Sequence, residues 1–248
     1  MTAARAIRTI FATVVLMLSV PIAAHASTFH ELAQLLSKGL YDEAIEKCTQ
    51  WLEAYPEANG RLRYLRGRAY HGIGWFGSAE EDLAPLGDFA PWPNWPPASE
   101  MVAKIAEMRR LAPEHVKEIK SGNRVLFRVY YDEDNAWTRA LIAMLPDAWR
   151  KVGNFYKVDL DETAVFIFGD AARYNAFFRT WSGRFAKHWQ WAGGESGVLI
   201  FCQRDPSGAT LAKAGSDYFR GTALHEYSHL VCRRVLGHAP IPPWLSEG

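Results

Sequence analysis

The sequence predicts an α+β protein in which N-terminal α-helical hairpins precede a small mixed α/β domain. Two observations lead to this prediction. In the first half of the chain, a pattern of glycine, aromatic, alanine and proline residues recurs after thirty-five residues. In the second half, short β-branched and aromatic runs typical of strands alternate with longer stretches of helical periodicity. The 248 residues are 49% hydrophobic, which is ample for such a core.

Residues 1–26 are predicted to be a secretory signal peptide. Arg5 and Arg8 precede an apolar run over residues 10–20, and residues 24–26 have the small-x-small form of a cleavage site. The run is short for a transmembrane helix, and an uncleaved membrane anchor is the alternative. We therefore expect cleavage after Ala26 and a periplasmic or secreted mature protein with no stable membrane insertion.

Composition limits the classes of partner and the redox chemistry. The formal net charge is +1 at pH 7, and no basic stripe follows the chain, so no nucleic-acid partner is expected. The three cysteines, Cys48, Cys202 and Cys232, do not form the even set of a disulfide framework. An oxidising compartment would permit a Cys202–Cys232 disulfide, but the spacing does not establish it.

Residues 27–112 are predicted to form a helical domain. The recurring residues are Gly39, Tyr41, Ala44 and Pro56, followed by Gly74, Phe76, Ala79 and Pro91. Their spacing is close to the period of about 34 residues of tetratricopeptide repeats, which the segment at 39–45 resembles. Two repeats rarely suffice for a stable solenoid, so a further helix at 98–111 is expected to cover the open end. Such repeats would offer a surface for a protein partner.

Residues 121–248 are predicted to form the second domain. We expect strands at 124–131, 164–168 and 198–202, helices at 137–156 and 174–181, and a turn at 193–197. The strand at 198–202 is expected to present a free edge, with which an extended peptide could pair through main-chain hydrogen bonds.

A helical metal-binding motif, His225-Glu226-Tyr227-Ser228-His229, follows the last predicted strand. On a helix, residues four apart lie on one face, so His225 and His229 can bind a single Zn²⁺. Glu226 would then lie beside the metal, where its carboxylate can take a proton from a zinc-activated water. The motif therefore predicts a hydrolytic zinc site with Glu226 as its general base, completed by a third ligand downstream.

A second motif lies in the final run, Pro242-Pro243-Trp244-Leu245-Ser246-Glu247-Gly248, whose last five residues have the form W-L-x-E-G. An H-E-x-x-H helix followed by a W-L-x-E-G segment is similar to the gluzincin metallopeptidases, in particular the peptidase MA-like group. The resemblance covers roughly the second half of the chain. It implies a zincin-like fold, Zn²⁺ as cofactor, peptides or proteins as substrates, and Glu247 as the third ligand.

His238 is the competing third ligand. The metzincin pattern would require a glycine and a histidine at the positions of Cys232 and Val235, so Glu247 is favoured. The family pattern continues beyond the position of Gly248, which predicts a domain truncated at its C-terminus and weakened in zinc binding.

The sequence therefore predicts an exported zinc-dependent metallopeptidase with an N-terminal tetratricopeptide-like region. The alternative is a non-catalytic peptide- or protein-binding protein whose metallopeptidase domain is degenerate.

Overall fold

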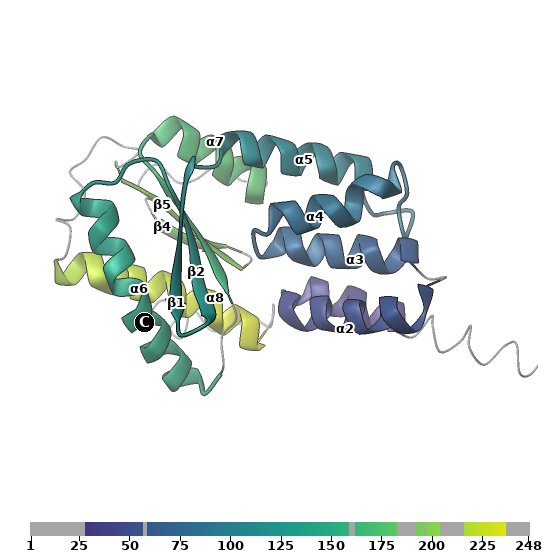
Figure 1. The fold of residues 1–248 in the computed structure, drawn as a ribbon, viewed down its shortest axis with the longest axis horizontal. Coiled ribbons are helices and arrows are strands. Elements are labelled where there is room, and N and C mark those ends of the chain that lie inside the picture. Colours follow the sequence, from purple (N-terminus) through teal and green to yellow (C-terminus); the bar gives the residue numbers. More distant parts are fainter. Residues whose placement is uncertain are drawn as a thin grey trace, which may run out of the picture.

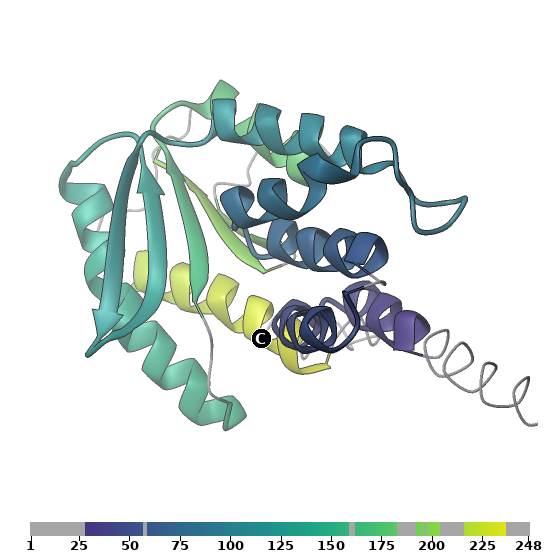
Figure 2. The same cartoon turned by 45° about the vertical axis from the view of Figure 1, so that its right-hand side comes forward.

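The structure, a computed structural model, describes residues 28–56, 59–158, 162–182, 192–195, 197–203 and 216–236. The predicted signal peptide lies outside these residues. Within them, a five-stranded sheet has the N-terminal helices on one side and two long helices on the other (Figures 1 and 2). No helix in the described part of the chain combines the length and the hydropathy that a membrane span requires.

The N-terminal part is a succession of helices packed side by side (Figure 1). Residues 28–37 are helical and are followed by α2 (Tyr41–Ala54), α3 (Asn59–Gly72), α4 (Phe76–Leu83), a 3₁₀ turn (Ala84–Leu86) and α5 (Ala98–Leu111). Gly39 and Gly74 occupy equivalent turns between helices, with φ of 74° and 81°. Glycine adopts such angles without steric cost, so the thirty-five-residue recurrence reflects one turn geometry used twice. The α-helical part of the predicted fold is confirmed, whereas the specific tetratricopeptide arrangement stays a prediction.

The sheet has the strand order β1-β2-β3-β5-β4. Its strands are β1 (His115–Ser121), β2 (Arg124–Tyr131), β3 (Thr163–Phe168), β4 (Ala192–Glu195) and β5 (Val198–Cys202). The three inner strands run parallel, and β1 and β4 are antiparallel edge strands. Strand β1 was not predicted, because its side chains are mostly exposed and carry no apolar alternation.

Two predictions about this sheet are wrong. The segment at 193–197 is not simply a turn, since residues 192–195 pair with β5 as strand β4. Strand β5 is not an edge, because β3 and β4 flank it on its two sides. All five of its residues are buried, and such a continuous apolar run is typical of an interior strand. Among the described strands, β4 is the outermost on this side of the sheet.

Three further helices complete the fold: α6 (Ala136–Tyr156), α7 (Ala171–Ser182) and α8 (Asp217–Leu236). Helices α6 and α8 pack together on one face of the sheet, around Phe127, Val165 and Leu199. Helix α7 packs on the opposite face together with α4 and α5. The sheet is therefore covered on both faces, which suits its parallel inner strands.

The N-terminal helices and the sheet share one hydrophobic core. Phe76 of α4 packs against Phe166 of β3 with ring centroids 5.8 Å apart, and Ile105 of α5 belongs to the same buried cluster. A Cβ atom on Gly74 would lie only 2.8 Å from the Cβ of Ala164. The core is thus continuous across the predicted boundary near residues 112–121, and the division into two domains stays a prediction.

All three cysteines are buried, and none is part of a disulfide. Cys202 lies in the core shared with α4, α5 and α7, whereas Cys232 lies next to Tyr156 of α6 on the other face. The sheet separates the two thiols, so the Cys202–Cys232 disulfide is not formed.

Candidate metal centre

Helix α8 carries the H-E-x-x-H motif and has two chemically distinct sides. Phe219, Ala223, Tyr227 and Leu230 are at most 2% exposed and pack towards the sheet. Their spacing of three to four residues is that of one helix face. Near the start of the helix, the Ser216 hydroxyl accepts a hydrogen bond from the Phe219 amide at 3.2 Å, which satisfies one of the amides left free at a helix N-terminus. The motif's two histidines and Glu226 are each partly exposed, as a metal site open to water requires.

The His225 and His229 side chains converge on one point. Their Nε2 atoms are 2.8 Å apart, and their ring planes are nearly perpendicular, at 87°. In the absence of an ion this contact is a hydrogen bond in which one imidazole donates. Zinc–nitrogen distances near 2.0–2.1 Å in a tetrahedral site place two such nitrogens about 3.3 Å apart. A small opening of the pair would therefore admit an ion, and the pair fits two of its ligands.

The third ligand lies beyond what the structure describes. Both candidates, Glu247 and His238, belong to residues 237–248, which are outside the described ranges. Within those ranges, no group of three His, Cys, Asp or Glu side chains could hold a metal ion. The structure therefore brings together two of the predicted ligands, His225 and His229. The predicted base, Glu226, follows His225 in the same helix, and the third ligand stays a prediction.

Tyr174 of α7 is a buried polar residue that the sequence analysis did not single out. Burial raises the pKa of Tyr174 above its ordinary value, and the charges of Cys202 and Glu226 raise it further. Its hydroxyl has no hydrogen-bond partner among the described residues. Burying a hydroxyl without a hydrogen-bond partner normally lowers the free energy of unfolding by about 1–3 kcal/mol. In the sequence Tyr174 looks like one more aromatic residue of an apolar helix face, so only the fold reveals its position.

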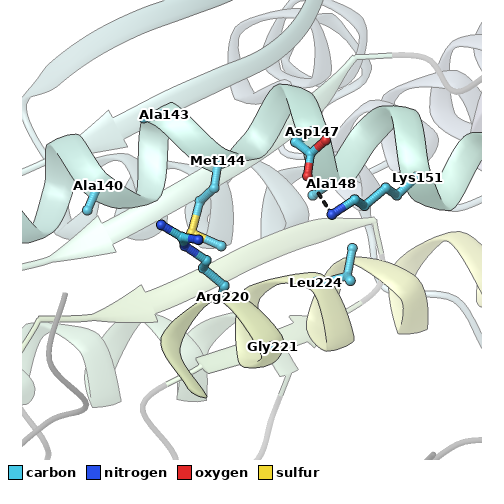
Figure 3. Close-up of a pocket in the computed structure, with 9 residues that line it drawn as sticks. All are labelled: Ala140, Ala143, Met144, Asp147, Ala148, Lys151, Arg220, Gly221 and Leu224. Atoms are coloured by element: carbon cyan, nitrogen blue, oxygen red, sulfur yellow. Dashed lines mark ion pairs between the residues drawn. The ribbon is translucent and has the colours of Figure 1, made fainter. Parts of the chain in front are cut away.

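A groove between α6 and α8 leads to His225. One cavity of about 420 Å³ is bordered by His225, Leu224 and the 79%-exposed ring of Phe155. A second cavity, of about 450 Å³, continues the groove along both helices, where Met144 and Arg220 point towards each other (Figure 3). Lys151, Gly221 and Leu224 border both cavities, and Lys151 pairs with Asp147 at 2.8 Å. The groove can accept apolar side chains close to the histidine pair.

Strand β4 supplies a second feature next to α8, against which it packs. It is the outermost strand on this side of the sheet, and its outer edge pairs with no other described strand. The backbone groups on such an edge can form main-chain hydrogen bonds with an added extended chain. The edge predicted for substrate pairing therefore exists one strand further out than expected.

Comparisons with known proteins add nothing to this picture, since no family model, curated protein or solved structure matches the chain. The function is therefore inferred from the site itself and from the two motifs that resemble the gluzincins.

Proposed function

We propose that this protein is an exported, zinc-dependent metallopeptidase of the gluzincin type that hydrolyses peptide bonds. The observation that carries the proposal is the 2.8 Å approach of the His225 and His229 Nε2 atoms on the open side of α8. Both histidines and Glu247 would hold the ion. When bound there, zinc supplies Lewis acidity that activates water and polarises a peptide carbonyl.

The side chain of Glu226 has the role of general base. It follows His225 directly in the helix and is only partly buried, so water and substrate can reach its carboxylate. The carboxylate accepts a proton from the attacking water and later returns it to the leaving amine nitrogen. The free edge of β4 would orient the peptide main chain, and the groove beside His225 would hold an apolar side chain.

The deciding experiment compares hydrolysis of an unfolded protein such as casein by wild type and by Glu226→Gln. The amide keeps the shape of the side chain but cannot accept the proton. We expect kcat/KM to fall by about 10²–10⁴-fold while the zinc content is unchanged. The matched control is Glu114→Gln, a change of an exposed glutamate far along the chain, which should leave the rate unaltered. Cleavage that persists in Glu226→Gln contradicts the assignment.

The alternative function is a non-catalytic peptide-binding protein. A polar pocket between the N-terminal helices and α7 favours it, because none of His225, Glu226 and His229 borders that pocket. A wild-type protein that binds zinc and peptides but cleaves neither casein nor short peptides would support this alternative.

A further inference from the structure

A third cavity, of about 470 Å³, lies between the N-terminal helices and α7, apart from the groove between α6 and α8. Its walls come from the helical residues 28–37, from α2 and α3, from the connector at 94–96 and from Trp181 of α7. Neither His225 nor His229 borders it. We refer to it as the α3–α7 pocket, and its volume is within the range of small-molecule sites.

Aromatic rings form much of the wall of the α3–α7 pocket. The Trp181 ring stacks on the His71 imidazole with centroids 5.0 Å apart and planes inclined by 10°. The Tyr41 ring lies so close to α3 that a Cβ atom on Gly72 would be 2.6 Å from it. Trp95, from the connector, closes another side. These rings provide flat apolar surfaces for the body of a ligand.

Two cationic side chains lie at or beside the pocket, and one carboxylate, that of Glu100, acts on them. The Arg68 guanidinium lies over the Trp95 ring, 4.3 Å from its centroid, and forms no ion pair with any described residue. Lys104 of α5 does not border the pocket itself but donates a hydrogen bond to the carbonyl oxygen of its wall residue Trp181 at 3.2 Å, and it has no ion-pair partner in the described ranges. Burial lowers the pKa of Lys104, and the nearby Arg68 charge lowers it further, opposed by Glu100. Two cations therefore repel each other here, with one carboxylate to offset them.

The His71 imidazole adds an unsatisfied polar atom. Its Nε2 is shielded from solvent and has no hydrogen-bond partner among the described residues. Buried polar atoms are normally hydrogen-bonded, and an exception calls for a partner that is not part of the chain. A ligand oxygen would meet this need by accepting a hydrogen bond from the tautomer that carries its proton on Nε2.

We propose that the α3–α7 pocket binds an organic carboxylate. The carboxylate accepts hydrogen bonds from the Arg68 guanidinium, whose planar fork matches its two oxygens. His71 is the second polar contact, and the apolar body of the ligand lies against Trp95 and Trp181. A bound anion offsets the mutual repulsion of Arg68 and Lys104. The inference is independent of the proposed zinc chemistry, because it uses none of those residues.

The test uses the full chain and N-acetylphenylalanine as the probe, with N-acetylphenylalanine amide as its neutral match. Titration calorimetry and tryptophan fluorescence report binding. We expect the acid to bind at least about tenfold more tightly than the amide, since a charge-assisted contact is lost in the latter. Arg68→Gln should lower the affinity for the acid by at least about tenfold. Arg63→Gln, which removes a charge from the same helix but does not border the pocket, should leave it unchanged.

Lys104→Gln provides a second variant if circular dichroism shows that Arg68→Gln is unfolded, and it should weaken binding severalfold. A pentapeptide with a free C-terminal phenylalanine identifies the source of the carboxylate. If the pentapeptide binds as tightly as N-acetylphenylalanine, the natural ligand is the C-terminal carboxylate of a peptide. If the pentapeptide binds much more weakly, the natural ligand is a small organic acid. The proposal is overturned if the acid does not bind, if acid and amide bind equally, or if Arg63→Gln weakens binding as much as Arg68→Gln.

Discussion

Gly197, in the turn that links β4 to β5, lies directly against the backbone of Gly72 at the end of α3. A Cβ atom on Gly197 would be 2.6 Å from the Gly72 carbonyl oxygen, and the φ of Gly197 is 101°. The two residues are far apart in the sequence and belong to different predicted domains. Their contact shows that the N-terminal helices press against the strand pair next to the proposed metal centre.

Gly197→Ala should therefore destabilise the protein. The new methyl group meets backbone, which cannot move aside like a side chain, and the left-handed φ adds strain. We expect the free energy of unfolding to fall by at least about 2 kcal/mol in denaturant titrations. Gly77→Ala on α4 is the control, since no atom lies within 4 Å of its added Cβ. An unchanged stability of Gly197→Ala would mean that this contact is absent in solution.

Zinc should bind to the untagged protein at about one ion per chain and raise its melting temperature. Binding to the folded state alone stabilises it by about 2.7 kcal/mol when free zinc is a hundredfold above Kd. The double variant His225→Ala/His229→Ala should lose both effects. His30→Ala, which removes an exposed histidine of the first helix, should keep them. Elemental analysis that still finds stoichiometric zinc in the double variant would refute the assignment.

The third ligand can be identified by chelator competition. Glu247→Ala should weaken zinc binding at least about tenfold, because loss of a ligand costs more than loss of the groups that orient it. His238→Ala is the matched test of the competing ligand and should have little effect. The reverse result, with affinity dependent on His238 and indifferent to Glu247, would end the gluzincin interpretation.

Stability should fall as the pH is lowered from about 7 to 5, partly through His71. Burial lowers the pKa of His71 to about 3, with added effects from the positive charges of Lys104 and Arg68. In the unfolded chain, a histidine takes up a proton near pH 6.5, so acid favours unfolding between these two values. We expect His71 to account for about 1–2 kcal/mol of the loss at pH 5.

His71→Phe should make this pH dependence shallower, since phenylalanine can still stack on Trp181 and does not titrate. His30→Phe serves as the control for an exposed histidine. The measurement is chemical denaturation in a buffer free of carboxylates, which would otherwise compete for the α3–α7 pocket. Equal slopes for wild type and His71→Phe would show that His71 is not held neutral in the folded state.

Local patterns in the sequence were sufficient to predict several elements. The i, i+4 spacing of His225 and His229 indicated a shared helix face, and both imidazoles do converge there. The repeated Gly39 and Gly74 marked two equivalent turns, because positive φ is a property of the residue and its neighbours alone. Elements of this kind depend on contacts within a few residues.

Relations between distant segments were decided only by the tertiary structure. Gly193 and Gly194 look like a turn in the sequence, yet they form strand β4 because β5 supplies the hydrogen-bond partners. Likewise, Arg68 on α3 and Trp181 on α7 give no sign of a common pocket until the shared core brings those helices together. The sequence by itself determined which residues could bind a metal and where helices turn. Long-range packing decided that β4 is an edge strand and that the charges of Arg68 and Lys104 lie near each other. Strand pairing and burial depend on both partners, so one segment of sequence does not fix them.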